Sequence, residues 1–165
     1  MADGNARLLW RVRWAVGVFI FGLVVSGVTA IPLEMEVRWL SGWQGLGAQW
    51  VARVREGIEA TGQLYPFMAY GTDWLAFGHF AIAIIYIGAW REPVRNRWLF
   101  DAGLVLCALV VVYALVFGQV RGIPLGWRLI DCSFGVFGAV PLWLGRKWVG
   151  EIQTFRSAAA PSSFA

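Results

Sequence analysis

The sequence predicts an all-α integral membrane protein, in which four transmembrane helices form an up-down bundle and an amphipathic helix lies between the first and second. Of the 165 residues, 59% are hydrophobic and only 15% are charged. The mean hydropathy of +0.62 lies far above that of soluble domains. Four apolar runs reach membrane length, since about 20 helical residues cross a hydrocarbon core of roughly 30 Å.

The first predicted span covers residues 12–32. It has features of a secretory signal peptide, because arginines precede it and small residues lie near its end. Its apolar run is longer than a typical signal core, so we expect a retained helix. Within it, Gly22, Ser26 and Ala30 follow a small-xxx-small spacing, which lets a neighbouring helix approach closely. We therefore predict that these residues pack against another helix.

The long connection after this span, residues 33–71, contains the predicted amphipathic helix at about residues 43–62. Apolar residues recur there every four positions, whereas charged residues occupy the other faces. The apolar positions are Leu46, Trp50, Val54 and Ile58. The segment is too polar to cross a membrane, and we expect it to lie along the outer membrane surface.

Three further spans are predicted at residues 72–90, 98–118 and 126–145. A tight loop, "REPVRNR", joins the second span to the third, and we expect its arginines to meet lipid headgroups. These arginines are Arg91, Arg95 and Arg97. The bundle is predicted to form one domain over residues 1–156, and the unpatterned tail, residues 157–165, is predicted to be disordered.

The basic residues predict the orientation of the chain. Nine of the 14 lysines and arginines fall on the side of the two termini, and of the other five, Arg38, Arg53 and Arg55 are interspersed with glutamates, whereas Arg121 and Arg128 are not. The nine are Arg7, Arg11, Arg13, Arg91, Arg95, Arg97, Arg146, Lys147 and Arg156. This bias predicts that both termini are cytoplasmic and that the chain lies in the cytoplasmic membrane. The net charge of +4 does not indicate nucleic-acid binding, because basic clusters beside apolar runs suit anionic lipids better.

Ionisable residues occur in the outer halves of the second and fourth spans. They are Asp73 and His79 on the second span, and Arg128 and Asp131 on the fourth. Such groups are costly in lipid, so they face protein or water and take partners. Counted along the helices, His79 lies roughly 10 Å and Asp131 roughly 7 Å below the outer surface. If the two spans face each other, His79 can bind Asp131, and Arg128 can neutralise Asp73 or Asp131.

Arg128 and Asp131 also belong to a predicted packing face. They are three residues apart and share a helix face with Gly135 and Gly138. This face is therefore predicted both to approach other helices closely and to carry the polar groups.

Three interpretations of this polar cluster stay open. The residues can form a satisfied network that sets helix register. They can instead line a water-accessible pocket, with His79 as proton acceptor, Asp131 orienting it and Arg128 holding a phosphate or carboxylate. A metal or haem site has the least support, because one histidine and no clustered thiols leave too few ligands. We therefore expect no metal and no cofactor.

The remaining reactive residues do not indicate an enzyme class. Cys107 and Cys132 fall in separate apolar runs and form no CxxC motif, so we interpret both as small packing residues. No nucleophile elbow and no phosphate-binding loop occurs in the sequence. Catalytic residues are therefore not assigned.

Two stretches, "TDWLAFGHF" and "RLIDCSFGVFG", resemble the VanZ-like membrane proteins. That family pairs an acid and a histidine at the start of one helix with an aspartate and glycines at the start of a later one. Here Asp73 and His79 are six residues apart, and the lysine that precedes the family's histidine is absent. Because of these departures, the resemblance implies no role for the residues of this chain.

The absence of an enzyme motif, the short connections and the small-residue faces favour a structural, assembly or accessory subunit. Such a subunit would bind another membrane protein or further copies of itself. The alternative is a lipid-active enzyme or carrier with an outward-facing site at His79, Asp131 and Arg128. A pocket around these residues would favour the alternative, whereas a filled core with exposed apolar faces would favour the subunit.

Overall fold

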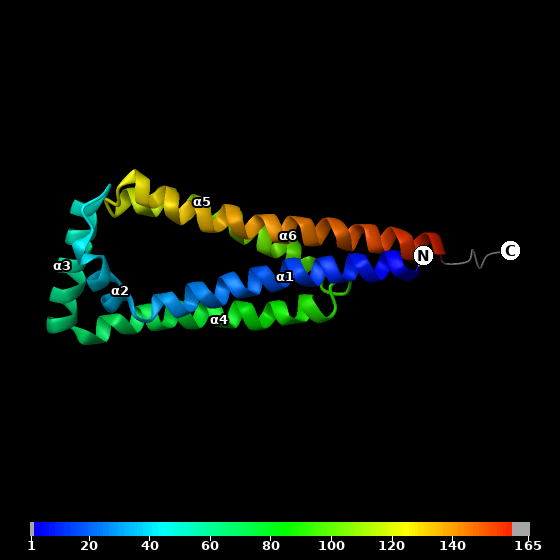
Figure 1. Ribbon diagram of the computed structural model, residues 1–165, viewed down its shortest axis with the longest axis horizontal. Coiled ribbons are helices and arrows are strands. Elements are labelled where there is room, and N and C mark those ends of the chain that lie inside the picture. Colours follow the sequence, from blue (N-terminus) through cyan, green and yellow to red (C-terminus); the bar gives the residue numbers. More distant parts are fainter. Residues whose placement is uncertain (1, 160–165) are drawn as a thin grey trace. The chain divides into compact units, whose positions relative to one another are not determined.

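The computed structural model describes residues 2–159, and in that range every regular element is a helix (Figure 1). The all-α fold class is therefore confirmed. Six α-helices and two 3₁₀ helices follow one another: α1 (Ala2–Ala30), α2 (Leu33–Trp39), η1 (Leu40–Gly42), α3 (Ala48–Leu64), η2 (Pro66–Ala69), α4 (Tyr70–Arg91), α5 (Arg97–Val120) and α6 (Leu125–Ala159).

Four of these segments are long and apolar enough to cross a membrane, as the sequence predicted. They are Gly4–Ala30, Pro66–Arg91, Arg97–Val120 and Leu125–Ala158. α1 begins well before the first predicted span, and α6 continues well past the end of the last one. Hydropathy identifies the part of a helix that suits lipid, whereas backbone hydrogen bonding extends equally through polar residues. The helical residues at the end of α6 include the first part of the predicted tail, and residues 160–165 lie outside the described range.

The chain forms two compact units within the range predicted as one domain. Unit 1 contains the described parts of Met1–Gly22 and Ile84–Ala165, and unit 2 is Leu23–Ala83. Helices α1 and α4 each pass from one unit into the other. Each unit is therefore described by itself.

Unit 1 contains a packed core to which all four long helices contribute. Its fully buried large side chains come from α1, α5 and α6, and α4 adds the buried Tyr86 and Ala89. These large side chains are Val12, Val16, Phe100, Leu142, Val149 and Ile152. A short loop joins α5 to α6, and these two helices pack against each other. Gly122 ends α5 with a positive φ of 69°, a conformation that favours glycine.

Unit 2 contains α2, η1, α3 and η2 together with the adjoining parts of α1 and α4. Its buried hydrophobic residues are of small or medium size: Val37, Val51, Ala76 and Ala83. α3 begins after Gly47, which has a φ of 83°. The sequence placed Leu46 in this helix, and that prediction was wrong, because Leu46 precedes α3 and is 99% exposed. The turn at Gly47 separates the residue from the helix.

Candidate functional site

The predicted polar cluster is divided between the two units. Asp73 and His79 lie on the part of α4 that belongs to unit 2, whereas Arg128 and Asp131 lie on α6 in unit 1. The hydrogen bond between His79 and Asp131 therefore stays a prediction. The surroundings of each residue within its own unit show what it can do.

His79 is half-buried and binds the backbone of its own helix. Its Nδ1 lies 2.8 Å from the carbonyl oxygen of Leu75, one turn earlier. A carbonyl oxygen can only accept a hydrogen bond, so Nδ1 carries the proton and Nε2 is the basic nitrogen of the neutral ring. The imidazole is thereby held in one tautomer, with Nε2 left to accept a proton.

Arg128 packs against α5. Its Cγ and Cδ atoms lie 2.6 Å from where a Cβ atom at Gly118 would be, so the arginine stem occupies the space that the glycine leaves. One guanidinium nitrogen, Nη1, donates a hydrogen bond of 3.3 Å to the carbonyl oxygen of Leu115. Nε is buried and has no hydrogen-bond partner among the described residues. Arg128 therefore tethers α6 to α5.

Asp131 is exposed, and no hydrogen bond or ion pair joins it to another residue in the described range. The ion pair with Arg128 that the sequence allowed is not formed there. Asp131 precedes Gly138 by seven residues, which places both on one face of α6. A Cβ atom at Gly138 would lie 3.3 Å from Phe19 of α1 and 3.2 Å from Cys107 of α5.

The predicted packing glycines of α6 lie at close helix approaches. At Gly135 a Cβ atom would be only 2.5 Å from the carbonyl oxygen of Cys107, so α6 and α5 approach there at backbone distance. Gly103 and Gly145, which were not predicted from the sequence, also lie at close approaches. At Gly103 a Cβ atom would collide with the Tyr86 hydroxyl group, and at Gly145 it would lie 2.5 Å from Phe100.

On α1 the close approach falls at a different glycine from the predicted one. A Cβ atom at Gly22 would meet no atom of the described residues within 4 Å, whereas at Gly27 it would lie 2.7 Å from Phe80 and 3.1 Å from the carbonyl oxygen of Ala76. Ser26 and Ala30 are half-buried. The spacing pattern found the correct half of α1 but not the residue at the contact.

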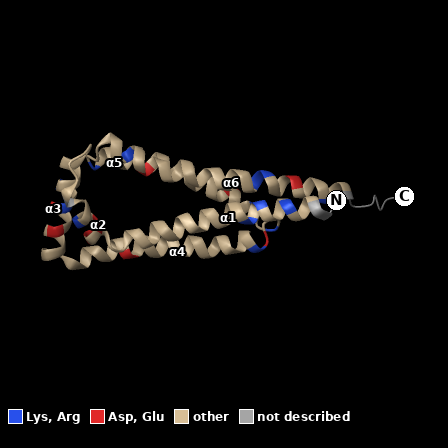
Figure 2. Cartoon of the chain, viewed as in Figure 1, with Lys and Arg blue, Asp and Glu red and all other residues tan. Residues whose placement is uncertain are grey.

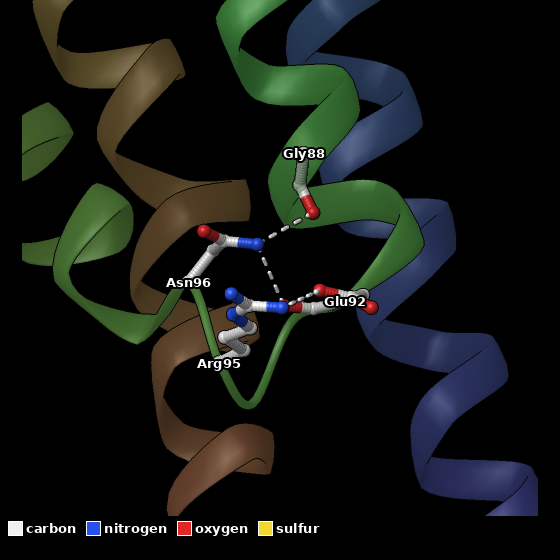
Figure 3. Close-up of polar contacts among 4 residues, drawn as sticks. All are labelled: Gly88, Glu92, Arg95 and Asn96. Atoms are coloured by element: carbon white, nitrogen blue, oxygen red, sulfur yellow. Dashed lines mark hydrogen bonds and ion pairs between the residues drawn. The ribbon is translucent and has the colours of Figure 1, made fainter.

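The end of α4 in unit 1 is closed by a polar network that the sequence argument missed (Figure 3). The Asn96 side chain donates hydrogen bonds to the carbonyl oxygens of Gly88, at 2.9 Å, and Glu92, at 3.1 Å. Arg13 of α1 donates to the carbonyl oxygens of Trp90, at 3.3 Å, and Arg91, at 3.5 Å. The last carbonyl groups of a helix have no partner within it, so these donors from outside stabilise the end of α4.

The three loop arginines differ in their surroundings. Arg91 and Arg95 are exposed, and Arg95 forms an ion pair of 3.4 Å with Glu92 (Figure 3). Arg97 is half-buried and donates a hydrogen bond of 2.6 Å to Gln153 of α6. Contact of Arg91 and Arg95 with lipid headgroups stays a prediction, whereas Arg97 binds Gln153 within the protein.

Basic residues mark several parts of unit 1 (Figure 2). They occur on the N-terminal part of α1, beside the loop between α4 and α5, and on the C-terminal part of α6. Asp101 of α5 forms an ion pair with Arg146 of α6. This contact joins α5 to α6 near the start of α5.

Potential metal ligands are scattered over the described residues 2–159. In that range no group of three or more His, Cys, Asp or Glu residues could hold a metal ion. Cys107 and Cys132 are free, buried thiols, and the Cys132 thiol lies 3.8 Å from the carbonyl oxygen of Val111 on α5. Their surroundings are those of packing residues at the contact between α5 and α6.

Comparison with protein-family models, with curated proteins and with solved structures gives no match. The class of the molecule rests on its own helices: it is an all-α membrane protein with four candidate spans.

Proposed function

We propose that this chain is an assembly or accessory subunit that binds another membrane protein, or further copies of itself, through α6. The observation that carries the proposal is the exposed carboxylate of Asp131 within an apolar helix. The other polar side chains in the same helix end have partners: Arg128 binds α5, and the Ser133 hydroxyl group donates to the carbonyl oxygen of Ile130.

An exposed carboxylate at this position is unfavourable in lipid. Asp131 follows the start of α6 by six residues, which corresponds to about 9 Å along the helix. A charged aspartate at the centre of a span costs about 3 kcal/mol on insertion scales, and this figure is the upper bound for Asp131, which lies nearer the surface. Phe134, three residues later on the same helix face, is also exposed, so the carboxylate lies beside an exposed apolar side chain. A cationic or hydrogen-bonding group from a partner helix would remove this cost.

The orientation completes the proposal. With the arginine-rich side in the cytoplasm, Asp131 belongs to the outer half of the cytoplasmic membrane. α3 then lies along the outer surface as an amphipathic helix, since Val51, Val54 and Ile58 are less exposed than Arg53 and Glu56. A topology reporter fused after Lys147 should be active only in the cytoplasm, and one inserted at Gly62 only outside. The reverse pattern would overturn the orientation.

Native mass spectrometry of the gently solubilised protein tests the assembly. The wild type should leave the membrane as a particle heavier than one chain, and Asp131→Asn should release the single chain with its thermal stability unchanged. Asp101→Asn is the matched control, because it removes an acid of α5 that already has Arg146 as partner, and it should leave the particle intact. A wild type that remains a single chain, or an Asp131→Asn particle of unchanged mass, would contradict the proposal.

The alternative function is a lipid-active protein that uses His79 as proton acceptor. One observation favours it: the bond from Nδ1 to Leu75 leaves Nε2 free to take up a proton. In that case His79→Gln should leave the particle mass unchanged and abolish lipid turnover in intact cells. Unchanged lipid composition with His79→Gln would exclude this role.

A further inference from the structure

The first two turns of α4 contain three aromatic residues and one acid on a single face. Tyr70, Asp73, Trp74 and Phe77 follow the helical spacing of three and four residues and together line a cavity of about 200 Å³. The whole cavity belongs to unit 2. Neither the assembly surface around Asp131 nor His79 accounts for it.

The Trp74 ring stands nearly at a right angle to each of the other two rings of this cavity. The ring centroids of Tyr70 and Trp74 are 5.9 Å apart with an interplanar angle of 87°. Those of Trp74 and Phe77 are 5.5 Å apart with an angle of 82°. All three side chains are exposed, so ring surfaces in more than one plane are available to a ligand.

From this geometry we infer that α4 carries an aromatic cage for an alkylammonium group. A cation near the face of an aromatic ring is attracted by the ring quadrupole, most strongly for tryptophan, and quaternary ammonium groups are recognised by sets of such rings. The cavity is several times the volume of a water molecule, about 30 Å³, and so admits a branched ammonium group. The exposed Asp73 supplies a negative charge that favours a cation and disfavours an anion.

The position of the cage favours a phospholipid headgroup as the source of the ammonium group. The candidate span begins at Pro66, and residues 70–77 cover about 10 Å of helix. The span Pro66–Arg91 has 26 residues, more than the about 20 that cross the hydrocarbon core. Its first turns, with Tyr70 and Asp73, therefore reach the headgroup region, and Phe77 lies inside the core. Aromatic residues are common at the depth of the headgroups, where they form the aromatic belt of membrane proteins. Such a belt does not require an acidic residue among the rings. The cage does not depend on the assembly role.

Lipid retention in mixed micelles tests the cage. The full-length protein is exchanged into detergent with equimolar phosphatidylcholine and phosphatidylglycerol, and the lipids that remain bound are counted by native mass spectrometry. The wild type should retain phosphatidylcholine preferentially, and Trp74→Leu should lower this preference about tenfold. Trp74→Phe, which keeps a ring, should restore part of it, and Asp73→Asn should weaken it.

Trp39→Leu is the matched control, since Trp39 is an exposed tryptophan of the same unit outside the cavity. It should leave the preference unchanged. Adding choline chloride separates the two sources of the ammonium group: displacement of the lipid indicates a soluble amine, and no displacement indicates the headgroup. Equal retention of the two lipids by the wild type, or a preference that survives Trp74→Leu, would overturn the inference and leave an ordinary aromatic belt.

Discussion

The two units of the chain differ in how their helices are joined. In unit 1, glycines bring helix backbones together, and large side chains such as Phe100 and Leu142 are fully buried. In unit 2, which is also rich in apolar residues, the buried positions are alanines and valines. Helices in lipid gain little from hydrophobicity alone, so close packing depends on where small residues lie. Unit 1 has small residues at several helix contacts. Among the described residues of unit 2, Gly27 is the glycine at which a Cβ atom would touch the backbone of another helix, at the carbonyl oxygen of Ala76.

The side-chain hydrogen bonds of the two units also differ in whether they join separate helices. Several of those of unit 1 join separate helices, as in Tyr86 to the carbonyl oxygen of Leu99, and Arg97 to Gln153. The side-chain hydrogen bonds of unit 2 stay within one turn or loop, as in Thr72 to Ala69 and Arg38 to Glu34. Contacts between helices resist separation of the helices, whereas contacts within one helix do not. The comparison therefore predicts that unit 1 determines the stability of the molecule.

The largest effect is expected from Gly135→Leu. The new side chain would meet the carbonyl oxygen of Cys107, which cannot move without shifting α5, and we expect a loss of about 3 kcal/mol in unfolding free energy. Val136→Leu, at the exposed neighbouring position, and Gly22→Leu, with open space around it, are the controls. Reversible unfolding in mixed micelles measures all three. Equal tolerance would mean that α5 and α6 are not in close contact.

A smaller effect is expected from Tyr86→Phe in unit 1. The variant loses the 2.8 Å hydrogen bond from the buried hydroxyl group to the carbonyl oxygen of Leu99, which should cost about 1 kcal/mol. Thr72→Val in unit 2 removes a hydrogen bond of 2.7 Å to the carbonyl oxygen of Ala69, three residues earlier in the chain, and should cost less. Comparing the two variants in the same unfolding assay sharpens the contrast, and a larger loss with Thr72→Val would reverse it.

The smallest effect is expected from Arg38→Gln in unit 2. Its ion pair with Glu34 joins exposed side chains one turn apart, with 2.6 Å between the two atoms. Such pairs contribute about 0.5 kcal/mol or less and are screened by salt. The midpoint of thermal unfolding should therefore stay nearly unchanged at low and high ionic strength. A clear, salt-sensitive drop would show that α2 supports the fold more than the comparison allows.

The spans were predictable because apolar length is a property of each segment alone. Side-chain partners were not, since they depend on which helices meet and at what rotation. The spacing of Arg128 and Asp131 allowed an ion pair, but the arginine stem fills the space beside Gly118 instead. Asp101 likewise pairs with Arg146, 45 residues away. The role of Asn96 at the end of α4 was also hidden, because asparagine is expected to cap the helix that follows it.

Thiol labelling in lipid bilayers tests the difference between the units most directly. Cys107 and Cys132 of unit 1 are 8% and 7% exposed, and Ala76 of unit 2 is 1% exposed. From these exposures alone, a cysteine at position 76 should react no faster than the two native thiols. A membrane-permeant maleimide is applied to the wild type and to Ala76→Cys in a background with both native cysteines replaced by alanine. If unit 1 holds the molecule together, unit 2 opens more readily and Ala76→Cys reacts faster than either native thiol. Native thiols that react as fast as Ala76→Cys, or faster, would contradict the account.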